Sequence, residues 1–488
     1  MSLPELGVGV IYTPALQPFL EAETDLVSVV EVEPETLWTF TEDPAEPYRP
    51  DWEALQRVRD LPQARLVHGV GFPIGGVRQP DPLHLPLLVE MIELLGAPWA
   101  SEHLAFNRAA GDEGPFATGF LLPPLQTRAG VAAAAESIRS VSTKLPVPFA
   151  VETGVNYLQP RAGQMSDGAF IGAVCETADC GILLDLHNLW ANERNGRQRI
   201  ADLLEEIPLE RVWEVHVAGG SEFQGYWLDA HSGAVPGELM SLARRILPEL
   251  PNLRAMIFEI TSPPFVARLG MDGLRRQVAA LREVWEQRAT LPRLKLARPP
   301  GPPPPAAPDP DWTPEAWEDG LGSLVVGRPP ATPVAEALAA DPGVAVLRRL
   351  VWNFRSGVLA DTLGLTCRLL LLHAGESYVR ALFDDFFASA PPELFATVEA
   401  EAFCAFLEQR RPDIPFLDEI MGFERAAFRA VLQGEPQLVP FRYEPSSLLE
   451  PLSRGLFPEA PVPGAFEVEV TPDVGAEHAN PVGVITSS

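Results

Sequence analysis

Lysine and cysteine are both scarce in this 488-residue chain. Only Lys144 and Lys295 are present, and neither stands in a segment that reads as a buried pocket, so chemistry through a lysine Schiff base is not expected. Four cysteines are too few for a disulfide framework, and their spacing is not that of a zinc ribbon. We therefore expect buried thiols in a reducing compartment.

Basic surface and long apolar runs are lacking as well. A formal net charge of −29 argues against a nucleic-acid partner, which would require a basic stripe. No uninterrupted apolar stretch approaches the ~20 residues that span a bilayer. The first residues show neither the basic region nor the apolar run of a signal peptide. These absences predict a cytoplasmic protein with no membrane partner.

Proline, by contrast, is concentrated in the segment RLKLARPPGPPPPAAPDPDW, which starts at Arg293. Such a run cannot supply the N–H groups of helices or sheet ladders and favours extended polyproline II. It predicts an N-terminal domain of residues 1–292, a linker of residues 293–311 and a second unit after the linker.

Eight short β-branched or apolar runs precede the linker: residues 6–12, 26–33, 65–72, 98–104, 148–153, 181–189, 212–218 and 254–261. Segments with helical periodicity lie between most of them, for example residues 81–95, 127–142 and 271–287. Apolar strands that alternate with amphipathic helices are typical of a parallel sheet covered by helices. Eight such units predict an α/β fold, the (β/α)8 TIM barrel. An open doubly wound sheet is the alternative.

Residues 312–454 predict a smaller, mainly α-helical domain. Its helical patterns cover residues 344–364, 376–388, 392–409 and 420–432, with few strand signals before residues 467–471. Residues 455–488 are rich in proline, glycine and small polar residues, and we expect them to form a tail.

Histidines and carboxylates gather where the predicted strands end. Six of the eight histidines precede the linker, and five of these close a strand or follow one directly. Four carboxylates repeat this placement. The residues are His68, His103, His187, His216, His231, Glu152, Asp185, Asp229 and Glu259. Because the carboxyl ends of the strands of a parallel barrel meet at one mouth, we expect these side chains to converge there.

Convergence of so many acidic groups predicts a site for more than one metal ion. A lone histidine at a strand end is commonly a structural group, and a lone carboxylate commonly caps a helix. Burying several carboxylates side by side, however, is costly unless cations neutralise them. Imidazole and carboxylate without thiolate suit iron, manganese or zinc. No nucleophile elbow, Walker loop or GxGxxG motif offers another chemistry.

Three residues are expected to orient the ligands rather than to bind metal: Glu102, His187 and Glu214. Glu102 would point away from its neighbour His103, and Glu214 would lie one layer below His216. Asp229 and His231, two residues apart, would point the same way in an extended chain. His84 falls in a predicted helix and is expected at the surface.

The motifs VHGVG, SEHLAF, VETGVNYL, LLDLHNLWAN, VHVAGG, LDAHSG and FEIT follow one another in this order. In their order and spacing the chain resembles the multinuclear non-haem iron-dependent oxidases, the family that includes the methanobactin-biosynthesis oxidase, over roughly residues 6–285. The resemblance implies a (β/α)8 barrel with two or three iron ions. It implies as metal ligands His68, His103, Glu152, Asp185, Asn188, His216, Asp229, His231 and Glu259.

Three positions depart from the family pattern. Gly220 stands where the family often has a second histidine after the Ala-Gly pair, Thr153 replaces a usual asparagine, and Thr261 replaces a usual aspartate. We expect metal binding to survive these changes and the choice of substrate to be affected by them.

The resemblance also implies an activity and partners. It implies an iron-dependent oxidoreductase that uses dioxygen to modify a ribosomally made precursor peptide, typically at cysteine. Family members usually act with a partner protein that captures the peptide. Residues 377–428 loosely resemble this helical partner, so we expect either a fused partner tethered by the linker or an unrelated helical domain.

Two other functions fit the same residues. One is a zinc- or manganese-dependent barrel isomerase or hydrolase without redox chemistry, which metal analysis would distinguish from an iron enzyme. The other is a non-catalytic peptide-binding or scaffold protein, for which substitution of His216 or Asp229 would leave the cellular product unchanged.

Overall fold

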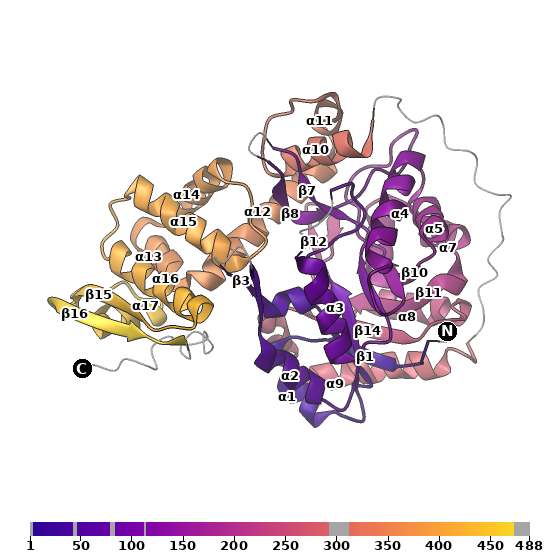
Figure 1. Ribbon diagram of the computed structural model, residues 1–488, viewed down its shortest axis with the longest axis horizontal. Helices are drawn as coiled ribbons and strands as arrows, with labels where there is room; N and C mark the ends of the chain where they lie inside the picture. The colour runs from indigo at the N-terminus through magenta and orange to yellow at the C-terminus, as the bar shows by residue number, and fades with distance from the viewer. Residues whose placement is uncertain (1–2, 42–45, 79–82, 112–113, 292–311, 473–488) are drawn as a thin grey trace.

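A closed barrel of eight parallel strands forms the N-terminal part of the molecule (Figure 1). The computed structural model describes residues 3–41, 46–78, 83–111, 114–291 and 312–472. Around the barrel the strands run in the order β1-β14-β11-β10-β9-β6-β5-β2. The predicted (β/α)8 fold is thereby confirmed, and the open doubly wound sheet was the wrong alternative.

Each predicted apolar run overlaps one barrel strand, and only β5 begins outside its run, one residue earlier at Ala64. The strands are β1 (Gly7–Ile11), β2 (Val29–Val32), β5 (Ala64–Gly69), β6 (Ala100–His103), β9 (Phe149–Glu152), β10 (Gly181–Asp185), β11 (Val212–Ala218) and β14 (Ala255–Glu259). β2, β9, β10 and β14 are buried at every position, as strands enclosed by a barrel and its helices must be.

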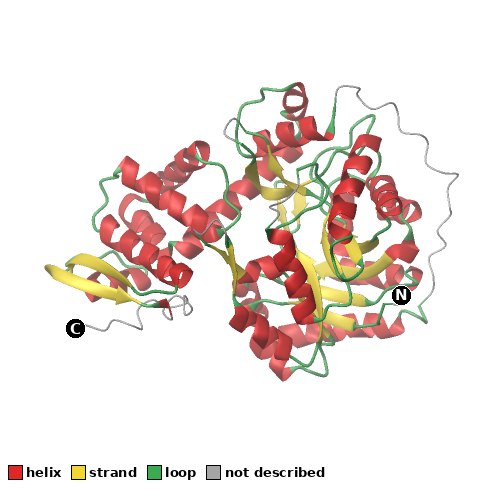
Figure 2. Ribbon diagram, viewed as in Figure 1, coloured by secondary structure: helices red, strands yellow, loops and turns green. Residues whose placement is uncertain are grey.

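Helices cover the outside of the barrel, as Figure 2 shows. They are α1 (Gln17–Ala22), α2 (Trp52–Asp60), α3 (His84–Leu95), α4 (Arg128–Ser142), α5 (Asp167–Ala178), α6 (Leu186–Arg194), α7 (Ile200–Glu206), α8 (Gly237–Ile246) and α9 (Pro263–Gln287), with the short 3-10 helices η1 (Pro14–Leu16), η2 (Pro34–Leu37), η3 (Leu209–Arg211) and η4 (Leu247–Glu249). α9 begins eight residues before its predicted start and is interrupted at Gly270, whose φ of 63° is not helical.

Three hairpins are inserted after barrel strands, and therefore lie on the side of the strands' carboxyl ends. They pair β3 (Trp38–Phe40) with β4 (Tyr48–Pro50), β7 (Phe106–Ala109) with β8 (Phe116–Leu122), and β12 (Ser221–Phe223) with β13 (Tyr226–Leu228). These insertions build up the wall around the mouth of the barrel.

The C-terminal part is largely helical and begins on the barrel itself. Its helices are α10 (Pro314–Val325), α11 (Pro333–Leu338), α12 (Pro342–Thr362), α13 (Gly364–Ala374), α14 (Glu376–Ser389), α15 (Ala396–Arg410), α16 (Leu417–Gln433) and α17 (Pro445–Ser453). α10, α11 and the first half of α12 share an apolar core with β7, β8 and the mouth loops. A separate apolar core starts at Leu359 and extends beyond α17 to Val470.

A two-stranded sheet closes the C-terminal part. β15 (Gln437–Tyr443) pairs antiparallel with β16 (Pro463–Val470). We expected residues 455–488 to form a tail, but residues 463–470 are a strand. Val468 and Val470 alternate with exposed glutamates, and both valines are buried in the apolar core of the C-terminal part. The rest of that tail from residue 473, and the predicted linker at 293–311, lie outside the described residues.

No single helix in the described part of the chain has both the length and the apolar composition to cross a membrane. α12 and α13 meet these two conditions only when taken as a pair, and that pair is bent by 105°.

Candidate metal centre

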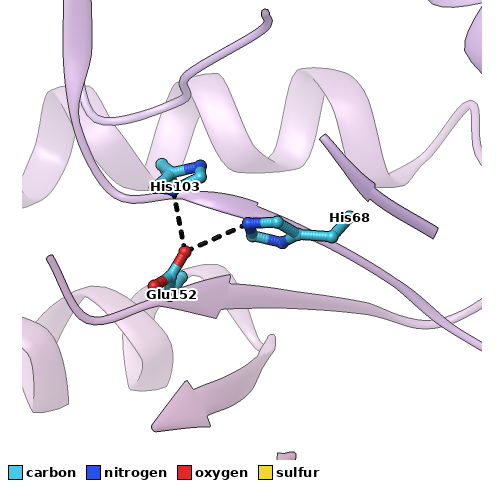
Figure 3. A group of neighbouring side chains, drawn as sticks. All are labelled: His68, His103 and Glu152. Carbon is cyan, nitrogen blue, oxygen red and sulfur yellow. Dashed lines mark ion pairs between the residues drawn. The ribbon is translucent and has the colours of Figure 1, made fainter. Parts of the chain in front are cut away.

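Two histidines and one glutamate from neighbouring strands meet at the mouth of the barrel (Figure 3). His68 is the penultimate residue of β5, His103 is the last residue of β6 and Glu152 is the last residue of β9. Glu152 Oε2 lies 3.1 Å from His68 Nε2 and 2.9 Å from His103 Nε2. These three side chains form one group that could hold a metal ion.

A second group of candidate metal ligands includes the same glutamate, Glu152. Ligand atoms of Glu152, Asp185 and His216 all lie within 4.8 Å of one another. Nδ1 of His216 also lies 3.1 Å from Glu259 Oε1. The two groups therefore share Glu152, as a carboxylate that bridges neighbouring ions would.

The chain of contacts continues into the loop after β13. Glu259 Oε2 lies 3.4 Å from His231 Nε2, which lies 3.0 Å from Asp229 Oδ1. Asn188, in the first turn of α6, donates from Nδ2 to Glu152 Oε1 at 3.3 Å. All nine residues that the family resemblance implies as ligands are thus brought together.

Many of these polar atoms are buried yet make no hydrogen bond to any described residue. They include Glu152 Oε2, Asp185 Oδ2, Glu259 Oε2 and both ring nitrogens of His216. Separations near 3 Å without hydrogen-bond geometry are what two ligands of one ion show, because metal–ligand bonds of about 2.0–2.2 Å at right angles place the ligand atoms about 3 Å apart. The donor set therefore fits metal ions better than it fits a hydrogen-bonded network.

The pKa values of several side chains at the mouth are shifted far from their usual ranges. Burial disfavours the charged form of His103, but the carboxylates of Glu152 and Glu102 together outweigh burial and raise the pKa of His103 well above its usual range. Burial, together with the nearby carboxylates of Glu259 and Asp229, raises the pKa of Asp185 well above its usual range. Such displacement of pKa values marks functional sites, and a metal ion would take the place of these protons.

The three residues expected to orient ligands do contact them. Glu102 Oε1 accepts the backbone N–H of His103 at 2.7 Å and lies 3.2 Å from His103 Nδ1. His187 Nδ1 lies 3.1 Å from Asp229 Oδ1. Glu214 lies farther from its predicted partner, since its Oε1 is 3.9 Å from His216 Nε2. Its Oε2 accepts a hydrogen bond from the indole N–H of Trp99.

Two acidic residues of the site were missed by the sequence analysis. Glu31, in β2, is fully buried, and its Oε2 lies 2.9 Å from His216 Nε2. Burial raises the pKa of Glu33 to about 7, against the opposing effect of His68. The signal was available: both carboxylates alternate with valine in VVEVE, a strand that is otherwise wholly apolar.

Two placements were predicted incorrectly. His84 is not at the surface: it is 5% exposed, and its Nε2 lies 2.9 Å from Glu35 Oε1. Asp229 and His231 are not in an extended strand, since both follow β13 in a loop and His231 has a φ of 43°. They face each other because the loop turns, which alternation along a strand could not have predicted.

A cavity of about 110 Å³ opens beside the histidine and carboxylate cluster. His103, Asn188 and Asp229 line it on the side of the cluster, and Phe120 and Tyr157 belong to its apolar wall. This volume accommodates several water molecules or one small side chain. The cavity therefore offers a place where a substrate group could reach the cluster.

Comparison with known proteins identifies relatives of the barrel. The family model of the RiPP precursor modification enzyme MbnB/TglH/ChrH matches residues 6–266. A UPF0276 protein of Streptomyces avermitilis is 33% identical over 247 residues, which is 49% of this chain and 48% of that protein. A UPF0276 protein of Chromobacterium violaceum is 29% identical over 224 residues, 46% of this chain and 79% of that protein. The chain thus spans about half the length of the Streptomyces relative.

Two solved structures are similar to the chain at low sequence identity. D-allulose 3-epimerase of a Methylomonas species has a TM-score of 0.39 at 14% identity, covering 59% of this chain and 100% of that one. A Thermus thermophilus protein whose crystals were soaked with ZnCl2 has a TM-score of 0.34 at 18% identity, covering 57% of this chain and 98% of that one.

Proposed function

The chain belongs to the RiPP precursor modification enzyme MbnB/TglH/ChrH family, and we propose that it is a multinuclear iron-dependent oxidase that modifies a ribosomally made peptide at cysteine with dioxygen. The observation that carries this proposal is the buried cluster of imidazole and carboxylate atoms that face one another without hydrogen bonds. Two or three iron ions are the expected complement.

The proposed ligands follow the contacts at the mouth. His68, His103 and Glu152 would hold one ion, and Glu152 with Asp185, His216 and Glu259 would hold a second. Asn188, Asp229 and His231 complete the set of side chains. When bound, iron would acidify a coordinated thiol and supply electrons to dioxygen.

The protein itself supplies position, charge and exclusion of water. The carboxylates outnumber the cationic groups around the cluster, so they favour cations over anions there. Leu122, Tyr157 and Phe170 belong to the apolar wall of the cavity and limit the water that reaches a bound side chain. Glu102 fixes the backbone of His103 and one edge of its ring.

The helical part would bring the peptide to this mouth. α10, α11 and the start of α12 share their core with the β7–β8 hairpin, next to the cavity. We propose that residues 312–472 act as a fused peptide-capturing unit, in place of a separate helical partner protein. A peptide held there would reach the mouth at a high effective concentration.

Activity can be tested with the full chain reconstituted with ferrous iron without oxygen. The substrate to be tried is a cysteine-containing precursor peptide, sought among the reading frames beside the gene, and a change of its mass is followed after oxygen is admitted. We expect modification that requires both iron and dioxygen and that a Cys→Ser peptide abolishes. Glu152→Gln removes the shared ligand and should reduce the rate by about 100-fold or more, whereas Glu35→Gln, in a buried glutamate–histidine pair outside the cluster, should not.

Two results would overturn the proposal. One is full activity with zinc or manganese alone under anaerobic conditions, which would identify a barrel isomerase or hydrolase without redox chemistry. The other is an unaltered cellular product after His216 or Asp229 is replaced, which would identify a scaffold rather than an enzyme.

A further inference from the structure

His187 differs from the other histidines of the mouth in what its two ring nitrogens face. It lies in the first turn of α6 and is fully buried. Trp227 Nε1 donates a hydrogen bond to His187 Nε2 at 2.9 Å. Because an indole N–H can only donate, Nε2 must be the accepting nitrogen, and the ring hydrogen stands on Nδ1. That nitrogen lies 3.1 Å from Asp229 Oδ1.

This arrangement excludes His187 as a metal ligand and gives it another role. One ring nitrogen already accepts a hydrogen bond, and the other carries a hydrogen, so neither has a free lone pair for an ion. Asp229 Oδ1 faces both His187 and His231. The backbone N–H of Asp229 also contacts the Tyr157 hydroxyl at 3.2 Å. Asp229 is therefore contacted by Tyr157 at its backbone and by His187 and His231 at the same side-chain oxygen.

Gly220 makes this contact possible. A Cβ at residue 220 would lie 2.4 Å from Trp227 Nε1, 2.5 Å from His187 Nε2 and 2.6 Å from the carbonyl oxygen of Leu228. No side chain fits beside the Trp227–His187 hydrogen bond. In the family that the chain resembles, a histidine often stands at this position. Here the space beside residue 220 is filled by an imidazole that comes from α6 instead.

Trp227 is itself fixed on two sides. The side chain of Asn195 accepts the backbone N–H of Trp227 at 2.7 Å and donates to its carbonyl oxygen at 3.0 Å. The guanidinium of Arg194 stacks over Trp227 at 5.1 Å and over Trp190 at 4.8 Å from the ring centres. The indole N–H, which determines that the ring hydrogen of His187 is on Nδ1, is thus held in place.

We propose that His187 is the positioning residue of Asp229, and that Trp227 and Gly220 together fix the imidazole in the tautomer that carries its hydrogen on Nδ1, the nitrogen beside this carboxylate. The inference rests on the proposed function, since it takes Asp229 as a metal ligand. Partners behind a ligand typically contribute 10- to 100-fold to metal affinity.

The chain offers a matched pair of variants for the test. Trp227→Phe removes the indole N–H that His187 accepts, whereas Trp190→Phe is the same change in the neighbouring ring, whose centre lies 4.8 Å away. Cobalt(II) binding to the full chain is measured by competition with a chelator, with the visible spectrum of bound cobalt and the number of ions at saturation. No peptide or dioxygen is needed.

We expect Trp227→Phe to weaken cobalt binding and to alter the cobalt spectrum, His187→Ala to weaken binding by about 10- to 100-fold, and Trp190→Phe to resemble the parent chain. All variants should bind the parental number of ions at saturation. Loss of one ion in His187→Ala would show that His187 is a ligand, and identical behaviour of the two tryptophan variants would show that it only fills space. Either result overturns the inference while the proposed function stands; a parent chain that binds no cobalt would overturn the proposed function.

Discussion

Glu31 is the buried carboxylate that approaches one of the histidines at the mouth of the barrel, His216. It lies in β2 and approaches His216, in β11, from across the barrel. His216 uses its other nitrogen, Nδ1, toward Glu259. A carboxylate behind a ligating imidazole fixes the ring and raises its basicity.

Removing the charge of Glu31 should therefore weaken metal binding without unfolding the barrel. We expect Glu31→Gln to lower the affinity for cobalt(II) by about 10- to 100-fold, measured by competition with a chelator. Glu35→Gln is the matched control, because Glu35 is also a buried glutamate paired with a histidine, but its partner His84 is not among the proposed ligands. Equal affinities in both variants would contradict this role for Glu31.

At the scale of single residues, the sequence predicted the cluster but not all of its members. Strand ends of a parallel barrel meet at one mouth, so His68, His103 and Glu152 could be placed together from strand periodicity alone. Glu31 could not, because its partner is three strands away around the closed barrel and their contact depends on closure and register. The pairing of His187 with Trp227 likewise depends on a hairpin whose turn the sequence left unplaced.

At the scale of elements, α13 is held at its first turn by a carboxylate from α16. Glu424 accepts the backbone N–H groups of Leu365 and Thr366 at 2.6 and 2.8 Å. These are among the donors that a helix start leaves without partners. Burial nevertheless raises the pKa of Glu424 to about 7, because the opposing effect of these N–H groups is smaller.

A raised carboxyl pKa makes stability fall as pH rises. The folded chain binds the Glu424 proton more tightly than the unfolded chain, so the group is favourable at pH 5 and its contribution is lost as pH rises through about 7. The Glu424→Gln variant carries no such charge. Its unfolding free energy, relative to that of the parent, should therefore rise between pH 5 and pH 8 by at most about 3 kcal/mol. Melting temperatures of both chains measured across this pH range would show the relative gain. Glu435→Gln, an exposed carboxyl just beyond α16, should show no such gain; a constant difference across this pH range would contradict the expectation.

The elements themselves were largely predictable, with exceptions that have a local cause. All eight barrel strands were found because buried strands are continuous apolar runs. β15 was missed because Pro440 interrupts its alternation, although a proline is tolerated in a two-stranded sheet with open edges. β16 was largely assigned to a tail because its proline and glycine outweighed the alternation of Val468 and Val470.

At the scale of the whole molecule, α10 joins the helical part to a loop of the barrel mouth. Glu318 Oε1 accepts the backbone N–H of Val77 at 2.7 Å, and its Oε2 lies 3.0 Å from Arg78 Nη1. Asp319 binds the same arginine and the backbone N–H of Ala110. Contacts between residues so far apart in the chain cannot be predicted from local patterns, which is why the start of the helical part on the barrel could not be foreseen.

The contacts of Glu318 with Val77 and Arg78 should contribute to the local stability of the loop after β5. Glu318→Ala leaves the N–H of Val77 without its acceptor and Arg78 with one carboxylate fewer, a loss of about 1–3 kcal/mol of local stability. Amide hydrogen exchange of residues 70–78 should then become about tenfold faster or more, while exchange in β10 and β11 stays unchanged. Because His68 lies one residue before the end of the strand that leads into this loop, metal affinity should fall as well. Glu315→Ala, on the exposed side of the same helix, is the control. Unchanged exchange in residues 70–78 would mean that α10 rests on the barrel through its apolar face alone, with Leu321 and Leu324 sufficient to hold it.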